Sequence, residues 1–495
     1  MASNYYLGID IGSSSIKIAL VENETGKCLA QIQEPQDEMS MVSIQKGWAE
    51  QDPKDWWNYA CIGVKKIIKE SGISANDIHG VGIAYQMHGL VVVDKEGRPL
   101  RKSIIWCDSR AVELGNRAFE ELGPEYCETH LLNSPGNFTA SKLRWVKENE
   151  PHLFEKIYKI MLPGDYMAYK LSGNICTTLS GLSEGIFWDF KRSEVSKELL
   201  AYYELDTDVI PKLVETFGEQ GTVSEKGAAE SGLSEGTPIL YRAGDQPNNA
   251  LALDVFNPGE IAATGGTSGV IYAVTDKLST RETSRINNFA HVNHSLDNNR
   301  IGKLLCINGA GIQYRWLRNT LNVSSYTEMN DLAAEVSVGS EGVFLIPFGN
   351  GAERMLGNKI VGSSVSNLDL NRHTNAHICR AALEGIAFAF AYGMEILEKD
   401  GVKTSIIKTG NDNLFRSEIF AKTVSTLLDT EIEIYNTSGA VGAARACALK
   451  EGSYDGFSAF LKKDKGVTVC PDKNVSAYRN AYQNWKKELQ TILNK

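Results

Sequence analysis

The sequence predicts an α/β protein built from two similar halves. Apolar runs of strand length alternate with longer stretches of helical periodicity, which is the pattern of α/β proteins. A strand, a turn rich in Gly, Ser or Thr, and a second strand occur at the N-terminus and again near the middle of the chain. The length of 495 residues leaves room for two domains, each with its own core.

The two strand-turn-strand units locate the boundary between the halves. The first unit places strands at 5–12 and 16–22 around three serines, and the second places strands at 260–265 and 270–276 around Gly-Thr-Ser-Gly. The boundary then lies just before the second unit, so we divide the chain into an N-terminal domain, 1–253, and a C-terminal domain, 254–495. No low-complexity tract or long charged linker interrupts either part, so we expect both to be ordered.

The remaining elements follow from local patterns. Asp52 as a helix cap, with Pro53 at the first helical position, predicts a helix whose apolar face extends to Ile68. A second helix is predicted from Ala376 to Leu397. Apolar and β-branched runs predict further strands at 78–86, 90–94, 103–106, 237–243, 405–410 and 431–435.

Composition excludes several classes of function. Hydrophobic residues make up 42% and charged residues 23% of the chain, as in soluble globular proteins. The formal net charge of -10 disfavours a nucleic-acid partner, because binding to a phosphate backbone usually needs a broad basic face. No segment approaches the roughly 20 apolar residues that cross a bilayer, and the N-terminus does not resemble a signal peptide. We therefore expect no membrane partner and a cytoplasmic location.

Cysteine and histidine patterns indicate neither a disulfide framework nor a metal site. The nine cysteines are scattered singly without a CxxC pair, which favours reduced thiols. His291 and His294 form an HxxH pair, and His373 and His377 are four residues apart. Neither pair has a carboxylate or cysteine nearby in sequence to complete a zinc site, so we expect no metal there.

Two glycine-rich turns are candidates for a phosphate site. Asp10 ends the first strand and can hold a hydrated Mg²⁺, while the following glycine, three serines and main-chain N–H groups can donate to phosphate oxygens. The turn is not a P-loop, because GxxxxGK[ST] is absent and a strand follows it. Residues 265–269 form a second such turn, and together the two turns could hold a triphosphate from opposite sides. Either turn alone could be an ordinary hairpin turn.

Asp245 is the candidate catalytic residue. It follows the strand at 237–243 and precedes a helical stretch. An Asp at such a junction is most often a helix cap. However, a carboxylate at the carboxyl end of a strand, just ahead of the domain boundary, lies where ligands bind in open α/β sheets.

The turn at residues 86–89 is a candidate for binding a small polyol. It is predicted as a turn between strands 78–86 and 90–94, and the alternative interpretation is a hairpin turn with a structural role. A neutral His88 can donate to one hydroxyl and accept from another, while Met87 covers an apolar carbon edge. The alternative is a structural histidine in a turn. Asp108 is interpreted as the cap of a helix that begins near Ala111, and the small residues at 438–444 as a closely packed helix.

Taken in order, these segments resemble the FGGY family of carbohydrate kinases from residue 5 to about residue 450. Within that family the most similar group is the xylulokinases, on the segments GWAEQDPKDWW, YQMHGLVVVD, IIWCDSR, LPGDYMAYKLSG and GDQPNNA. The resemblance implies an actin-like ATPase (ribonuclease H-like) fold with two duplicated domains flanking a cleft. It also implies ATP and Mg²⁺ as cofactors and phosphorylation of a pentulose, D-xylulose, to its 5-phosphate.

The resemblance assigns roles to individual residues. Asp245 would be the catalytic base, and Met87, His88, Asp245 and Gln246 would bind the sugar. Asp10 and Asp245 would serve the metal. The nucleotide would lie against Gly12, Ser13, Ser14, Lys17, Gly266, Thr267, Gly309, Gln313, Gly410 and Asn413.

Two segments depart from the family pattern. The adenine-side loop, usually three glycines followed by Ala, reads Lys408 to Asn413 here and keeps only Gly410 and the terminal amide. Gln246 stands where Asn is common after the base. The alternatives are an actin- or chaperone-type ATPase, a non-catalytic sugar sensor, or a family kinase for ribulose, gluconate or glycerol. The oligomeric state is not readable from the sequence, and a homodimer stays open.

Overall fold

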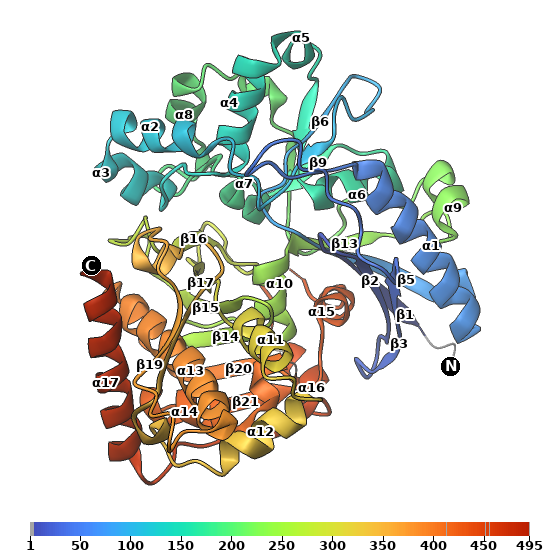
Figure 1. Cartoon of the computed structure of the whole chain (residues 1–495). Coiled ribbons are helices and arrows are strands. Elements are labelled where there is room, and N and C mark those ends of the chain that lie inside the picture. The colour runs from blue at the N-terminus through green and yellow to red at the C-terminus, as the bar shows by residue number, and fades with distance from the viewer. Residues whose placement is uncertain (1–3, 412, 451, 455, 495) are drawn as a thin grey trace.

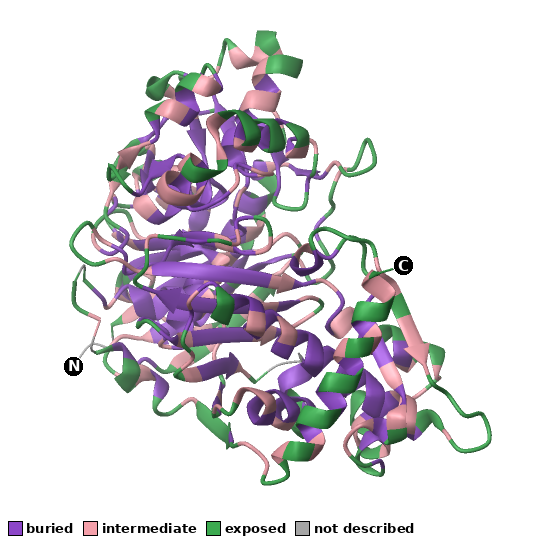
Figure 2. Ribbon diagram, turned by 90° about the vertical axis from the view of Figure 1, so that its left-hand side faces the viewer, coloured by how far each residue is buried: buried purple, intermediate pink, exposed green. Residues whose placement is uncertain are grey.

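The computed structural model describes residues 4–411, 413–450, 452–454 and 456–494. The chain forms two parts, each organised around one large sheet, with helices α10 (Asp245–Ala252) and α15 (Gly439–Ala446) at their junction (Figure 1). In Figure 2 the strands of the sheets are buried, whereas helices are exposed on their outer sides. No helix in the described ranges is long and apolar enough to cross a membrane.

The two large sheets share one topology, which confirms the predicted duplication. In each, the first strand pairs antiparallel with the second, the second pairs antiparallel with a third, and two further strands continue parallel on the other side. The N-terminal sheet has the order β13 (Ile239–Gly244), β5 (Ile78–Tyr85), β1 (Tyr5–Ile11), β2 (Ile16–Glu22), β3 (Cys28–Glu34). The C-terminal sheet has the order β16 (Asn287–Ala290), β17 (Ile301–Ile307), β15 (Gly269–Thr275), β14 (Glu260–Gly265), β20 (Ile406–Gly410), β21 (Ile432–Tyr435), β22 (Lys465–Val469).

Helices cover both sheets. The predicted cap is present, since the Asp52 side chain accepts from the Lys54 main-chain N–H at the start of α1 (Pro53–Ser71). The main helices of the N-terminal half are α2 (Val112–Leu122), α4 (Thr139–Asn149), α6 (Pro163–Ser172), α7 (Leu179–Glu184), α8 (Lys197–Tyr202) and α9 (Glu225–Ser231). Those of the C-terminal half are α11 (Gly311–Thr320), α12 (Tyr326–Ala334), α13 (Asn375–Lys399), α14 (Glu418–Leu428), α16 (Phe457–Leu461) and α17 (Val475–Leu493).

Helix α15 crosses from the C-terminal half to pack on the N-terminal sheet. A Cβ added to Gly8 of β1 would lie 1.9 Å from the Ala440 carbonyl oxygen, and one added to Gly82 of β5 would lie 1.9 Å from the Ala443 carbonyl oxygen. The helix backbone therefore touches the strands directly, which is possible only with small residues on both sides. This confirms the close packing predicted for 438–444.

Two local interpretations need correction. Residues 86–89 form the predicted turn between two strands, but the alternative interpretation as a β-hairpin turn is wrong, because β5 belongs to the large sheet whereas β6 (Val91–Val93) pairs with β8 (Lys159–Met161). Asp108 does not cap α2, whose cap residue, Ala111, makes no side-chain cap bond. Instead the buried Asp108 carboxylate accepts from the Ala49 main-chain N–H and pairs with Arg110. The pairing of β6 with β8 and the contact of Asp108 with Ala49 both join residues that are distant in sequence, which local patterns do not reveal.

Candidate functional site

A cavity of about 250 Å³ opens where the parallel strands β1, β5 and β13 end at one edge of the N-terminal sheet. The described residues that line it are Asp10, Gly12, Ser13, Ser14, Ser15, Lys17, Gln86, Trp106 and Asp245. The fold thus brings the first glycine-rich turn, called below the serine loop (residues 12–15), together with Asp10 and Asp245. All of these lining residues come from the N-terminal half.

Two carboxylates dominate the electrostatics of this cavity. Burial raises the pKa of Asp10, and the neighbouring Lys17, its cross-strand partner, opposes that rise. Burial together with the charge of Asp10 raises the pKa of Asp245 to about 7. Asp245 is the first residue of α10, and the cap residue before it is Gly244, which has no side chain. The Asp245 carboxylate lies in the cavity, and its pKa suits proton transfer near neutral pH.

The N-terminus of α15 closes one side of Asp10. A Cβ added to Gly439 would lie 2.5 Å from the Asp10 carboxylate oxygen Oδ2, so any larger residue there would displace that carboxylate. The buried Asn248 side chain donates to the Gly439 carbonyl at 2.9 Å and ties α15 to α10. This contact between Asp10 and a residue more than 400 positions away is a part of the site that sequence reasoning missed.

The segment at 86–89, called below the Met87–His88 turn, lies beside the end of β13, which Asp245 directly follows. A Cβ added to Gly244 would lie 2.6 Å from Met87 Cγ and 2.7 Å from a carboxylate oxygen of Glu184. The buried Met87 and Glu184 therefore pack directly against the main chain that precedes Asp245. Burial raises the pKa of Glu184 well above its ordinary value, which favours its neutral acid form.

His88 is held in one orientation and one tautomer. Its Nδ1 lies 2.9 Å from the Glu184 carbonyl oxygen, which can only accept, so Nδ1 carries the proton. Burial lowers the pKa of His88 to about 3, so the ring is neutral. The ring lies between Phe138 and Phe289, with centroids at 4.8 and 5.1 Å. The expected donor-and-acceptor role is therefore corrected: with Nδ1 occupied, Nε2 offers a ligand only an acceptor.

The second glycine-rich turn is anchored on the C-terminal half. The carbonyls of Gly266 and Thr267 accept from the main-chain N–H groups of Gly311 and Ile312 at 3.0 Å each, at the start of α11. A Cβ added to Gly309 would lie 1.7 Å from the Pro347 carbonyl oxygen. With its carbonyls engaged, this turn has its hydroxyls and N–H groups left for a ligand.

The remaining predicted nucleotide residues lie on the same half. Gln313 is buried on α11, and its Nε2 is among the buried atoms without a hydrogen-bond partner in the described chain. Gly410 ends β20, as predicted. Asn413 begins a short 3-10 turn, but its side chain lies outside the described part of the structure. Gln246 follows Asp245 in α10 and is half-buried.

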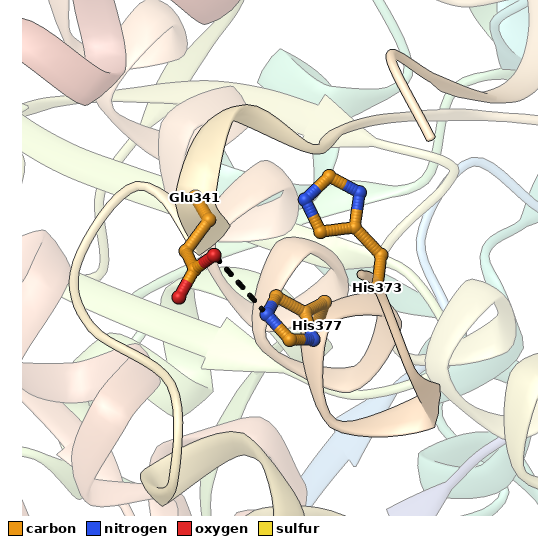
Figure 3. A group of neighbouring side chains, drawn as sticks. All are labelled: Glu341, His373 and His377. Carbon is orange, nitrogen blue, oxygen red and sulfur yellow. Dashed lines mark ion pairs between the residues drawn. The ribbon is translucent and has the colours of Figure 1, made fainter. Parts of the chain in front are cut away.

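The histidine pair at the start of α13, with His373 just before the helix and His377 in its first turn, does have a carboxylate nearby, contrary to expectation. The side chains of Glu341, His373 and His377 converge, and His377 Nε2 lies 3.8 Å from a Glu341 oxygen (Figure 3). However, Nδ1 of His373 accepts from the Asp369 N–H at 2.9 Å, and Nδ1 of His377 accepts from the Thr374 N–H at 3.1 Å. A neutral ring whose Nδ1 accepts carries its proton on Nε2, so the nitrogens that face Glu341 lack the free lone pairs of metal ligands. We assign the group to capping of α13.

The other histidine pair is structural. His291 lies 3.0 Å from the Tyr272 hydroxyl through Nδ1 and 2.9 Å from the Val255 carbonyl through Nε2. His294 Nδ1 accepts from the Arg300 main-chain N–H. Both rings are thus engaged within the C-terminal half.

Comparison with known proteins covers nearly the whole chain. The family model described as the FGGY family of carbohydrate kinases, N-terminal domain, matches residues 5–252, and the model of its C-terminal domain matches residues 261–450. A curated relative, the xylulose kinase of Haemophilus influenzae, is 30% identical over 98% of this chain and 100% of its own length.

Solved structures share the fold. The xylulose kinase of Rhodospirillum rubrum superposes with a TM-score of 0.86 at 24% identity, covering 99% of this chain and 100% of that one. The glycerol kinase of Plasmodium falciparum superposes with a TM-score of 0.88 at 20% identity, covering 99% and 98%. Because proteins named for different substrates superpose equally well, the fold alone does not select a substrate.

Proposed function

The chain belongs to the FGGY family of carbohydrate kinases and is a sugar kinase, and from that premise we propose that it transfers the γ-phosphoryl group of ATP to D-xylulose. Family membership sets aside the alternative of an actin- or chaperone-type ATPase. The observation that carries the proposal is the position of Asp245, which lines the cavity together with the serine loop and directly follows Gly244, against which Met87 packs.

Asp245 is proposed as the general base. A carboxylate with a pKa of about 7 can accept a proton from a sugar hydroxyl near neutral pH and is a stronger base than an ordinary aspartate. The hydroxyl oxygen then attacks the γ-phosphorus as the bond to the β-phosphate oxygen breaks, and the hydroxyl proton passes to Asp245. The residues act mainly by positioning and by stabilising charge.

Asp10 and Asp245 are the residues that would hold Mg²⁺. The charge of one carboxylate raises the pKa of the other, so two oxygen donors lie close together in a cavity that also offers serine hydroxyls. Such an all-oxygen donor set fits Mg²⁺. When bound, the ion would neutralise charge on the phosphates of ATP.

The nucleotide contacts divide between the two halves. We propose that Gly12, Ser13, Ser14 and Lys17 contact the phosphates from the N-terminal half, and that Gly266 and Thr267 contact them from the other side. The roles of Gly309, Gln313, Gly410 and Asn413 on the adenosine side rest on the family resemblance. The buried, unpartnered Gln313 amide supports one of them, because a buried donor without a partner is costly unless a ligand satisfies it.

D-xylulose is the proposed sugar because the site suits an uncharged polyol. His88 Nε2 accepts from a hydroxyl, Met87 and Trp106 offer apolar surface, and Gln246 offers an amide. The curated relative named above is a xylulose kinase that matches the chain end to end.

A substrate panel tests this proposal. ATP consumption is measured with D-xylulose, D-ribulose, D-gluconate and glycerol, and the product is identified by ³¹P NMR. We expect the highest kcat/KM for D-xylulose and a 5-phosphate product. A clear preference for another member of the panel would contradict D-xylulose as the substrate and would leave the assignment as a sugar kinase intact.

One observation favours a second candidate, an aldonic acid such as gluconate. The Met87–His88 turn itself carries no cation, but the positive charge of Arg354, in a short turn of the C-terminal half (Arg354–Leu356), contributes to lowering the pKa of His88. A guanidinium near the sugar could bind a carboxylate. If gluconate is the preferred substrate, Arg354→Gln should abolish that preference; unchanged gluconate kinetics would contradict the role of Arg354.

A further inference from the structure

We propose that Lys142 is a positioning residue for the sugar, because its ammonium joins the two main-chain segments that form the sugar side of the site. This inference rests on the proposed sugar role of the Met87–His88 turn.

The geometry of Lys142 is that of a clamp. It lies on α4 and is fully buried, and its Nζ donates to the His88 carbonyl at 2.8 Å and to the Ile105 carbonyl at 3.0 Å. Ile105 directly precedes Trp106, which lines the cavity. One buried side chain thus links the segment that carries His88 to the segment that carries Trp106.

A lysine is an unexpected residue for this position. Four of its neighbours on α4, Ala140, Ser141, Leu143 and Val146, are also buried, and a fully buried ammonium is unfavourable unless its environment compensates. The two carbonyls supply this compensation, because they accept hydrogen bonds from the ammonium. They belong to segments outside the regular ladders of strands β5 and β7 (Ser103–Ile104), so an apolar side chain here would leave both without this partner.

The His88 backbone needs such support. His88 adopts a φ of 62°, a left-handed conformation that is strained for a residue with a side chain. Lys142 holds its carbonyl, the Glu184 carbonyl holds its ring, and Phe138, the residue that precedes α4, packs against the ring. Loss of the first contact should release the turn and weaken sugar binding, with the nucleotide side unaffected.

The clamp also titrates in an accessible range. Burial lowers the pKa of Lys142 to about 7, an effect opposed by Asp108, Cys107 and Glu184 and assisted by Arg110. The ammonium form is therefore lost as pH rises above about 7, and charge-assisted bonds to the two carbonyls become ordinary ones. The neighbouring His88, with a pKa of about 3, stays neutral throughout this range.

The experiment is calorimetric titration of the full-length protein with the sugar in the absence of ATP, and separately with ATP in the absence of sugar, in an Asp245→Asn background that removes the titration of Asp245. The sugar used for titration is the member of the substrate panel with the highest kcat/KM. If D-xylulose is not that member, another sugar is titrated and the test of Lys142 stays the same. The variants are Lys142→Met and a matched control on the same helix, Lys147→Met, whose ammonium bonds to the Glu204 carbonyl and side chain and lies over the Phe154 ring.

We expect Lys142→Met to raise the sugar Kd about tenfold at pH 6.5, the factor for loss of hydrogen bonds to a charged group. Its Kd for ATP should stay within about twofold, and Lys147→Met should match the parent. The parent Kd should rise from pH 6 to pH 8.5, whereas that of Lys142→Met should not change with pH. A pH-independent parent Kd, or equal weakening of sugar and ATP in Lys142→Met, would overturn the proposal. The pH dependence of the parent Kd tests the proposal even if Lys142→Met fails to fold.

Discussion

The two sides of the cavity differ in how they are built. Asp10, the serine loop and Lys17 come from one continuous segment of eight residues, 10–17, and distant parts of the chain add Gln86, Trp106, Asp245 and Gly439. The sugar side is assembled from the Met87–His88 turn, Lys142 of α4, Glu184 of α7, and Phe289 of β16 in the other half. The first side presents charge to solvent, whereas the second is buried and neutral toward the ligand.

This difference corresponds to the two tasks of a kinase. Binding a phosphate and its cation needs charge and many donors, which a short loop at a strand end can supply. Selecting one sugar needs a fixed acceptor in an apolar frame, because discrimination comes from polar groups left unpaired by the wrong ligand. The predictions below separate the two sides, starting with the residue they share.

The largest effect is expected for Asp245→Asn, which removes the base and leaves the shape of the site. Turnover should fall by about 10² to 10⁴, the usual contribution of a general base. Sugar and ATP should still bind by calorimetry. The melting temperature at pH 8 should rise, because the wild-type protein ionises this carboxyl there against its raised pKa. Near-normal turnover would refute the assignment.

Asp10→Asn tests the phosphate side alone. The Mg²⁺ concentration for half-maximal turnover should rise by about 100-fold. Loss of a residue that merely supports a metal ligand already weakens metal affinity by up to about this factor. The sugar KM should stay nearly constant. Kinetics at varied Mg²⁺ measure both, and a selective loss of sugar affinity would contradict the division.

The pH profile tests the pairing of Asp10 with Asp245. An acid with a pKa of about 7 is mostly protonated below that pH, so kcat measured at saturating sugar should fall about tenfold from pH 8 to pH 6. In Asp10→Asn the neighbouring charge is gone, so the midpoint should move to lower pH. An unchanged midpoint would show that Asp10 does not act on Asp245.

The smallest effect is expected for His88→Ala on the sugar side. Loss of one neutral hydrogen bond should raise the sugar KM about fivefold and flatten the preference for D-xylulose over D-ribulose. The ATP KM should not change. Steady-state kinetics with both sugars provide the check. A change confined to the ATP KM would contradict the assignment of His88 to the sugar side.

The sequence predicts the parts of this structure that are local. Both glycine-rich turns, the duplicated strands and the cap of α1 depend on residues within a few positions of one another, and the structure has them where expected. The Met87–His88 turn lies between two strands as predicted, but its flanking strands do not form a hairpin, because β6 pairs with β8, which lies nearly 70 residues away. Lys142 and Glu184 carry no recognisable motif, since their function arises only from contacts made in the fold, and the small-residue pattern around Gly439 predicts close packing but not its contact with Asp10. The same holds for Glu341, which reaches His377 from a separate turn.

The division of the site is tested most directly by titrating D-xylulose and Mg·ATP separately into Asp10→Asn and His88→Ala. We expect Asp10→Asn to lose Mg·ATP affinity and keep sugar affinity, and His88→Ala to show the opposite pattern. If both variants lose both ligands together, or if the pattern is reversed, the two sides do not have the separate functions assigned to them.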